Sequence, residues 1–368
     1  MINCLIGTRA QLIKMAPVLR EIEARGIAYR LVFSGQHKAT MRSLLEEFGV
    51  VTEPDYLYDG PEISGIAQMG LWLVRVLLRG VTTRRALFST TGRGPHAMLV
   101  HGDTFSTLLG ALFGRIFGYE VLHVESGLTS GRLLEPFPEE FTRRLVFRLA
   151  NTGFCPGQWA CGNLSRYSLT AIDTGTNTIV DAVRLAAGSA ADDTAERDKP
   201  YAVVSLHRFE NIFRRERLEF IVSTLTGIAA RIRLIFVLHP ATESQLRKHG
   251  LIEQLKSNAN IELVPRMTYL PFMRLLLPAN FVVTDGGSNQ EELAVLKKPT
   301  LLMRGATERQ EGLGETAVLS RYDVPTIERF VEQHVAAHPD GTLFNSPESV
   351  SPSSAIADEL ERYQEKRL

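Results

Sequence analysis

Residues 97–125, AMLVHGDTFSTLLGALFGRIFGYEVLHVE, contain the pattern on which the fold of this chain depends. The stretch opens with an apolar run, AMLVH, continues through the helical pattern TFSTLLGALFGRIF, and ends with a second apolar run, YEVLHV. Two short apolar runs on either side of a helical segment are typical of a strand, a crossover helix and a parallel strand. The stretch therefore predicts one βαβ unit, with Asp103 and Glu125 at the ends of its two strands.

The same alternation continues on both sides of this unit. Strand-like runs include INCLIG and YRLVFSG before it, and YAVVSLH, RLIFVLHP, NIELV, NFVVTDGG and PTLLM after it. Between the first two runs, Leu12, Ala16 and Leu19 recur at helical spacing, which predicts a helix with one face packed on a sheet. The sequence therefore predicts an α/β protein with parallel sheets.

Length and composition predict two domains. The 368 residues and a hydrophobic content of 44% are enough for two cores. Between the halves, the segment RLAAGSAADDTAERDKP loses periodicity, which predicts a linker. We expect two Rossmann-like domains, residues 1–172 and 173–352, whose parallel sheets face each other across a cleft. A C-terminal helix over 353–368 is expected to cross back to the first domain.

Charge and cysteine content exclude several classes of protein. Lys plus Arg and Asp plus Glu both count 41, so the net charge gives no sign of a nucleic-acid or anionic-membrane partner. Three cysteines are too few for a disulfide framework, and the spacing in CPGQWAC matches no usual zinc pair. The apolar helix candidate GLWLVRVLLRGV is too short to span a bilayer, and no signal-like segment precedes the first strand. We therefore expect a soluble, cytoplasmic protein without membrane insertion.

Polar residues gather at the predicted strand ends, where open parallel sheets bind their ligands. Acids end two successive strands of the first half, whereas basic residues and glycines end strands of the second half. This division suits a substrate with a sugar at one end and a nucleotide phosphate at the other. The strand-end residues are Gly7, Thr8, Arg9, Gln36, His37, His101, Asp103, Glu125, His207, Arg208, His239, Asp285, Gly286 and Gly287.

The stretch TDGGSNQEEL has two interpretations. In one, Ser288 and Glu291 form a capping box after a glycine turn. In the other, Gly286 and Gly287 leave backbone amides open at a helix N-terminus, where a diphosphate gains from the amides and the helix dipole. Arg309, in the downstream TERQEG, suits phosphate oxygens and favours the second interpretation.

Local alternatives remain for the other polar residues. Asp103 could cap the helix that follows it. Glu139 and Glu140 in PFPEEFTRRL would each favour a first helical turn through the macrodipole. His207 and Arg208 could be a satisfied pair on a loop surface. None of these alternatives explains why acids end strands in one half and basic residues end strands in the other.

Taken together, these segments resemble the UDP-N-acetylglucosamine 2-epimerase family, in particular its non-hydrolysing members. The motifs that carry the resemblance are GTRAQLIKMAP, SGQH, VHGDT, HVESGL, PFPEEFTRR, TGTNTIVDA, LHRFENI, YLPF, TDGGSNQEE and TER, in family order over roughly residues 4–312. The resemblance implies two Rossmann-like domains in a glycosyltransferase-B-like arrangement, a homodimer, and no nicotinamide or metal cofactor.

The resemblance also implies roles for individual residues. Asp103, Glu125 and Glu139 take the positions of acid/base carboxylates around the sugar, and His207 takes a catalytic position beside the diphosphate. Family positions and strand-end residues together give these substrate-binding candidates: Arg9, Lys14, Arg208, His239, Gly286, Gly287, Ser288, Glu292 and Arg309.

The reaction that the resemblance implies is the interconversion of UDP-GlcNAc and UDP-ManNAc, which supplies precursors for surface polysaccharides. UDP leaves by elimination to give a 2-acetamidoglucal, and then adds again. A positioned carboxylate contributes about 10²- to 10⁴-fold as a general base, and arginines and helix amides stabilise the leaving phosphate. Inversion at C2 requires proton transfer on both ring faces, which accounts for several carboxylates.

The sequence departs from the family pattern at several points, one of which is Ala39, where regulated bacterial members place a glutamine. GTRAQ replaces the common GTRPE, so Gln11 stands in place of a carboxylate, and DGGS replaces DSGG, so Gly286 lacks a hydroxyl. Open alternatives are a hydrolysing UDP-sugar 2-epimerase, a 2-epimerase of a modified UDP-sugar, a glycosyltransferase, and a non-catalytic sugar-nucleotide binder. The retained carboxylates argue against the last of these.

Overall fold

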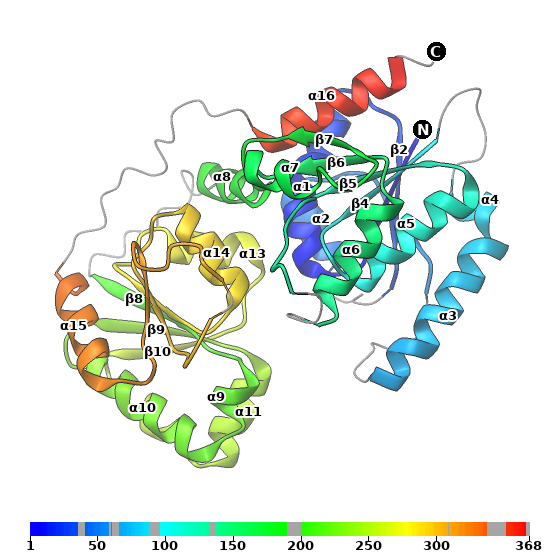
Figure 1. Cartoon of the computed structure of the whole chain (residues 1–368). Coiled ribbons are helices and arrows are strands. Elements are labelled where there is room, and N and C mark those ends of the chain that lie inside the picture. The colour runs from blue at the N-terminus through cyan, green and yellow to red at the C-terminus, as the bar shows by residue number, and fades with distance from the viewer. Residues whose placement is uncertain are drawn as a thin grey trace. The chain divides into compact units, whose positions relative to one another are not determined.

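The computed structural model divides the chain into two units, which are described separately (Figure 1). Unit 1 comprises Met1–Ala182 and Pro347–Leu368, and unit 2 comprises Val183–Ser346. The strand-end candidates Gln36 and His37 lie outside the described residues. The structure describes residues 1–35, 41–58, 60, 66–88, 96–132, 137–189, 200–307, 309–336 and 351–365.

Unit 1 is built on a seven-stranded sheet. Its strands are β1 (Ile2–Ile6), β2 (Tyr29–Phe33), β3 (Asp55–Tyr56), β4 (Ala97–His101), β5 (Glu120–Val124), β6 (Thr152–Cys155) and β7 (Thr170–Asp173). They pair in the order β3-β2-β1-β4-β5-β6-β7, and the described pairs are all parallel. The order changes direction between β1 and β4, which makes this pair the topological switch point where ligands bind in such folds.

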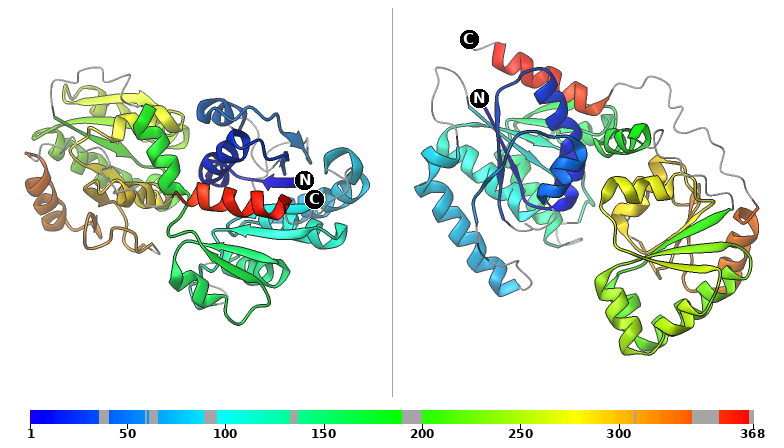
Figure 2. Two further views of the ribbon diagram at one scale, coloured as in Figure 1. Left: turned by 90° about the horizontal axis from the view of Figure 1, so that it is seen from above. Right: turned by 180° about the vertical axis from the view of Figure 1, so that it is seen from behind.

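The helices of unit 1 connect these strands. They are α1 (Arg9–Ala24), α2 (Met41–Phe48), α3 (Ile66–Thr82), α4 (Arg84–Leu87), α5 (Phe105–Phe117), α6 (Glu139–Leu149), α7 (Gln158–Asn163), α8 (Ile179–Ser189, which runs on into unit 2) and α16 (Pro352–Glu365). The C-terminal helix α16 lies beside α1 (Figure 2). Arg25, which follows α1, donates to Asp358 of α16, and Asp181 accepts from the backbone N–H of Ser353 at 2.9 Å.

The predicted linker is helical at its start. Helix α8 continues to Ser189, so the first residues of RLAAGSAADDTAERDKP are ordered, whereas the sequence predicted a loop there. The side chains of Val183 and Ala186 are fully buried, and this burial favours continuation of the helix.

The core of unit 1 explains how α5 is placed. All five residues of β1 and all five of β4 are buried, as expected for central strands of a parallel sheet. A Cβ on Gly110 would lie 2.4 Å from Val100 Cγ1, and one on Gly114 would lie 2.5 Å from Val121 Cγ2. Glycine at these two positions therefore lets α5 pack closely on β4 and β5, which fixes the helix N-terminus beside the strand ends.

Unit 2 is built on a six-stranded parallel sheet. Its strands are β8 (Tyr201–Ser205), β9 (Arg233–Leu238), β10 (Ile261–Pro265), β11 (Val282–Thr284), β12 (Thr300–Leu302) and β13 (Ala317–Leu319). They pair in the order β10-β9-β8-β11-β12-β13, so the switch point lies between β8 and β11. The helices are α9 (Phe209–Ile212), α10 (Arg215–Ala229), α11 (Pro240–Lys248), α12 (Ile252–Lys256), α13 (Tyr269–Leu276), α14 (Gly287–Val295) and α15 (Val324–His334).

The predicted fold class is confirmed: the protein is an α/β protein with two parallel sheets. Across the described ranges, no helix is both long and apolar enough to cross a membrane. Cys4, Cys155 and Cys161 are free thiols, and the first two are buried.

Candidate functional site

Glu125 stands at the carboxyl end of β5 in an unusual backbone conformation. Its φ is 62°, in the left-handed region that non-glycine residues rarely adopt. Such a conformation costs about 1–3 kcal/mol and persists only where the surroundings hold it. Here the surroundings are side chains from two other segments, which bind the carboxylate.

The carboxylate of Glu125 forms a buried ion pair with Lys14 of α1. Lys14 Nζ lies 2.8 Å from Glu125 Oε1, and both side chains are 11% exposed. Asn177 Nδ2 donates to the same oxygen at 2.8 Å. Burial alone would raise the pKa of Glu125, but the charge of Lys14, the adjacent His101, which is charged only at acid pH, and the two hydrogen bonds outweigh burial and lower it. Glu125 is therefore held as a carboxylate.

His101, at the end of β4, lies on the other side of the same carboxylate. Its Nε2 is 3.1 Å from Glu125 Oε2. The contact lacks hydrogen-bond geometry, and neither ring nitrogen has a hydrogen-bond partner within the described residues. Burial lowers the pKa of His101 to about 4, so the ring is neutral at pH 7. A neutral imidazole with both nitrogens open can exchange a proton beside this carboxylate.

Asp103 binds an arginine and does not cap a helix. The N-cap of α5 is Thr104, whose hydroxyl accepts from the backbone N–H of Thr107. The capping alternative for Asp103 is therefore wrong by one residue. Asp103 Oδ2 instead accepts from Arg143 Nη2 at 2.5 Å. This contact joins the end of β4 to α6.

The two adjacent glutamates at the start of α6 have different environments. Glu140 is fully buried and accepts from Thr129 Oγ1 at 2.6 Å, Ser130 N at 3.1 Å and Arg144 Nε at 3.0 Å. It therefore fixes the loop that follows β5. Glu139 is partly exposed, and its carboxylate makes no hydrogen bond or ion pair with any residue that the structure describes.

Gln11 is part of the scaffold around the switch point. Its Oε1 accepts from the backbone N–H of Gly7 at 2.9 Å and of Thr8 at 3.1 Å. Its Nε2 donates to the carbonyl of His101 at 2.5 Å and to Thr107 Oγ1 at 2.9 Å. Only a side chain that both accepts and donates can make all these bonds, so an amide fits here better than an ionised carboxylate.

His123 and Asn177 support the site, although the sequence analysis did not select them. His123 is fully buried, and burial lowers its pKa to about 4. Its Nε2 lies 2.8 Å from the Gly102 carbonyl and therefore donates to it, while Nδ1, 2.9 Å from Ser126 Oγ, accepts. His123 thus links the loops that carry Asp103 and Glu125. The motifs HVES and TGTN contain these residues, but neither motif indicates which side chain faces which loop.

Asp285, at the end of β11, organises the strand ends of unit 2. It is fully buried, and its carboxylate accepts from the backbone N–H of His207 at 3.0 Å, the backbone N–H of Arg208 at 3.0 Å, and Asn211 Nδ2 at 2.8 Å. His207 Nδ1 lies 3.5 Å from Asp285 Oδ1. The turn after β8 is therefore fixed by a carboxylate from the neighbouring strand.

Helix α14 begins at Gly287, with Gly286 as an N-cap that has no side-chain hydrogen bond. Of the two interpretations of this stretch, the capping box of Ser288 and Glu291 is wrong, because Ser288 lies inside the helix and is exposed. Glu291 instead accepts from Arg309 Nη1 at 3.0 Å.

The two glycines bring the start of α14 close to basic side chains. A Cβ on Gly286 would lie 3.2 Å from His207 Cε1. A Cβ on Gly287 would lie 3.2 Å from Arg309 Nε and 3.4 Å from Arg208 Nη2. Two guanidinium groups and an imidazole therefore lie near this helix N-terminus, and such an arrangement has the chemistry to bind a phosphate group.

His239 and Glu292 complete the candidates of unit 2. The rings of His239 and His207 stack with centroids 5.5 Å apart. His239 Nδ1 accepts from Ala241 N at 3.3 Å, which leaves Nε2 to carry the proton. Glu292 is 5% exposed within α14.

The candidates predicted from the sequence therefore form two groups. Lys14, Asp103, Glu125 and Glu139 belong to unit 1, together with Arg9, which starts α1. The second group, in unit 2, is His207, Arg208, His239, Gly286, Gly287, Ser288, Glu292 and Arg309. Within the described part of the chain, no cluster of three or more His, Cys, Asp or Glu side chains suits a metal ion.

Comparisons with known proteins identify the family of the chain. The family model described as UDP-N-acetylglucosamine 2-epimerase matches residues 20–345. A Methanocaldococcus jannaschii protein named UDP-N-acetylglucosamine 2-epimerase is 31% identical over 326 residues, which cover 84% of this chain and 85% of that protein. The solved structure of the UDP-GlcNAc 2-epimerase of that organism, in complex with UDP-GlcNAc and UDP, has a TM-score of 0.76 and 27% identity, covering 98% of this chain and 99% of that chain.

A second solved structure, UDP-GlcNAc 2-epimerase from Neisseria meningitidis bound to UDP-GlcNAc, has a TM-score of 0.75 and 25% identity. It covers 98% of this chain and 99% of that chain. These matches extend over nearly the whole chain. The chain therefore belongs to the UDP-N-acetylglucosamine 2-epimerase family, a family of isomerases with the glycosyltransferase-B-like fold.

Proposed function

We propose that this protein is a non-hydrolysing UDP-N-acetylglucosamine 2-epimerase that interconverts UDP-GlcNAc and UDP-ManNAc. The observation that carries the proposal is the buried Lys14–Glu125 pair, in which a carboxylate is held in a left-handed backbone conformation at a strand end. Backbone strain of this kind clusters at active sites. Relatives named UDP-N-acetylglucosamine 2-epimerase support the choice of substrate.

In this proposal the sugar ring is bound by the carboxylates of unit 1. Glu139 has no hydrogen-bonding partner among the described residues, so it suits proton transfer at C2 on one face of the sugar ring. Glu125 and Asp103 are each paired with a cation, Lys14 and Arg143 respectively. They provide the second proton-transfer position that inversion at C2 requires, and Lys14 supplies a proton donor next to Glu125.

The diphosphate is bound by unit 2. Elimination places negative charge on the departing UDP, and the open amides at the start of α14, with Arg208 and Arg309, would stabilise this charge. His207 lies beside the same amides and suits a hydrogen bond to a phosphate oxygen. Ser288 supplies a hydroxyl to the phosphate, and Glu292 accepts hydrogen bonds from the ribose.

The experiment that tests this function is incubation with UDP-GlcNAc, followed by chromatographic separation of the products. UDP-ManNAc should form and reach a constant ratio with UDP-GlcNAc, without accumulation of free sugar and UDP. Free ManNAc with stoichiometric UDP would identify a hydrolysing enzyme, and no product at all would indicate a binder. The Glu139→Gln variant is the matched control, because it should bind UDP and form little product.

We further propose that the protein is a homodimer and that α3 contributes to the interface. Trp72 and Val76 bury one face of α3 in unit 1, whereas Val74, Leu78 and Val81 are 54%, 62% and 43% exposed. These three apolar side chains share a helix face, because they are four and three residues apart. Sedimentation of Leu78→Glu should give a monomer, and an unchanged dimer would exclude this interface.

A further inference from the structure

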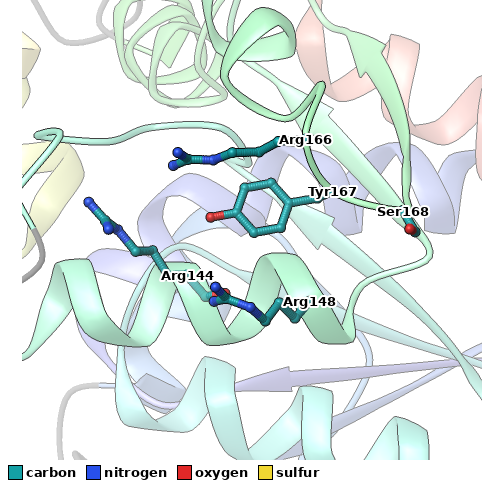
Figure 3. Close-up of a pocket in the computed structure, with 5 residues that line it drawn as sticks. All are labelled: Arg144, Arg148, Arg166, Tyr167 and Ser168. Atoms are coloured by element: carbon teal, nitrogen blue, oxygen red, sulfur yellow. The ribbon is translucent and has the colours of Figure 1, made fainter.

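Unit 1 contains a polar pocket that includes none of the candidate site residues. Its volume is about 350 Å³, within the range of pockets that bind small molecules. Helix α6 supplies two of its residues, and the segment after α7 supplies three (Figure 3). The lining residues are Arg144, Arg148, Arg166, Tyr167 and Ser168.

Tyr167 holds two of the three arginines in place. The Cζ atoms of Arg148 and Arg166 lie 5.6 Å and 5.3 Å from the centroid of its ring. In Figure 3, the ring lies between Arg166 on one side and the two arginines of α6 on the other. Packing on an aromatic ring restrains a guanidinium group but leaves its N–H donors available. The arginines are therefore partly preorganised for an anion.

The positive charge of the pocket is largely uncompensated. Arg144 Nε donates to Glu140 at 3.0 Å, but that carboxylate also accepts from Thr129 and from Ser130. Arg148 Nη1 donates to the backbone carbonyl of Arg144 at 2.8 Å. Among the residues described by the structure, neither Arg148 nor Arg166 forms an ion pair. Of the three guanidinium groups, only that of Arg144 pairs with a carboxylate of the described residues, and this carboxylate also pairs with Arg143.

We propose that this pocket binds a small phosphate-bearing anion, and that it favours a diphosphate over a single phosphate. Planar guanidinium groups bind phosphate oxygens through two parallel N–H donors, and three such groups match the larger negative charge of a diphosphate better than that of a single phosphate. Ser168 and the Tyr167 hydroxyl add two further donors at the pocket wall. The site is independent of the proposed function, because it shares no residue with the groups assigned to the UDP-sugar.

Pyrophosphate is the probe, and the double variant Arg148→Gln/Arg166→Gln tests the site. Both side chains are exposed, so the variant should fold, which circular dichroism checks. Arg20→Gln is the matched control, because Arg20 is exposed on α1, also in unit 1. Hydrogen–deuterium exchange locates the bound anion, which separates this pocket from the phosphate site of unit 2.

Pyrophosphate should protect the peptides that contain Arg148 and Tyr167 from exchange in the wild type and in Arg20→Gln. Its affinity for this site should fall at least about tenfold in the double variant, because two charge-assisted contacts are lost. Inorganic phosphate should bind more weakly than pyrophosphate. Absence of protection, equal affinity in the double variant, or equal binding of phosphate or citrate would each overturn the proposal.

Discussion

Replacing Lys14 with Met tests the ion pair on which the proposed site depends. The substitution removes the cation 2.8 Å from Glu125 Oε1 but keeps an apolar chain of similar length. An opposite charge this close lowers a carboxyl pKa by about 1–3 units, and one unit corresponds to about 1.4 kcal/mol. Removing one partner of a buried pair typically costs about 3–5 kcal/mol. We therefore expect the free energy of unfolding of unit 1 to fall by about 2–4 kcal/mol at pH 7. The loss is smaller than the full cost of an unpaired buried charge, because Glu125 can take up a proton.

The loss should depend on pH. The pKa of Glu125 in the folded protein lies below its ordinary value of 4.5, because Lys14, His101 and hydrogen bonds outweigh the opposing effect of burial. The ion pair therefore stabilises the fold above about pH 4.5, and this contribution is lost as the pH falls through the folded pKa. In Lys14→Met the pKa of Glu125 rises. The difference in stability between the variant and the wild type should thus be largest at pH 7 and should shrink below pH 4.5.

Tryptophan fluorescence during urea unfolding can measure this difference. The protein has two tryptophans, Trp72 and Trp159, and both belong to unit 1, so their emission reports the unfolding of that unit. Arg42→Met is the control, because Arg42 pairs with Glu53 on the surface, where both side chains are mostly exposed, and its loss should change the unfolding midpoint little. An unchanged midpoint in Lys14→Met at pH 7, or a shift of equal size at pH 7 and pH 4, would refute the reasoning.

Three further predictions concern single residues. Glu139→Gln should lower turnover by about 10²-fold or more and leave the melting temperature unchanged. Glu140→Gln should instead lower the melting temperature, because it weakens the bonds to the loop after β5. If Glu140→Gln lost turnover and Glu139→Gln lost stability, the two residues would have the opposite roles. Arg309→Ala should weaken UDP binding in calorimetry, and unchanged affinity would remove Arg309 from the phosphate site. Gln11→Glu should destabilise the protein at pH 7 and less so at pH 4, because burial raises the pKa of the new carboxyl group. If the stability difference between the variant and the wild type were the same at both pH values, the role of the amide would be contradicted.

The sequence predicted most of the described strands and the residues at their ends, because these depend on local patterns, but it did not predict the short strands β3, β6, β7 and β13. The apolar runs that precede Asp103 and Glu125 predict two buried strands, and this prediction does not depend on distant parts of the chain. The contact between Asp103 and Arg143 could not be predicted in this way, since it joins residues 40 positions apart. It depends on how α6 packs, and packing is a property of the whole unit.

Residues with the same local signal were not distinguishable from the sequence. Glu139 and Glu140 both lie in the first turn of α6, and only the fold of the preceding loop decides which of them is buried. The predicted caps failed for a related reason. Helix boundaries shift by one or two residues with tertiary context, and at α14 the candidate box residue Glu291 binds Arg309 instead.

The central claim is that the enzyme breaks and remakes the bond between C2 and its hydrogen while UDP departs and returns. Reaction of UDP-GlcNAc in D₂O, followed by proton NMR of the separated products, tests this claim directly. We expect the UDP-ManNAc formed to carry deuterium at C2, with loss of the C2 proton signal, and Glu139→Gln to slow this exchange together with epimerisation. UDP-ManNAc that retains the original hydrogen at C2 would contradict the account.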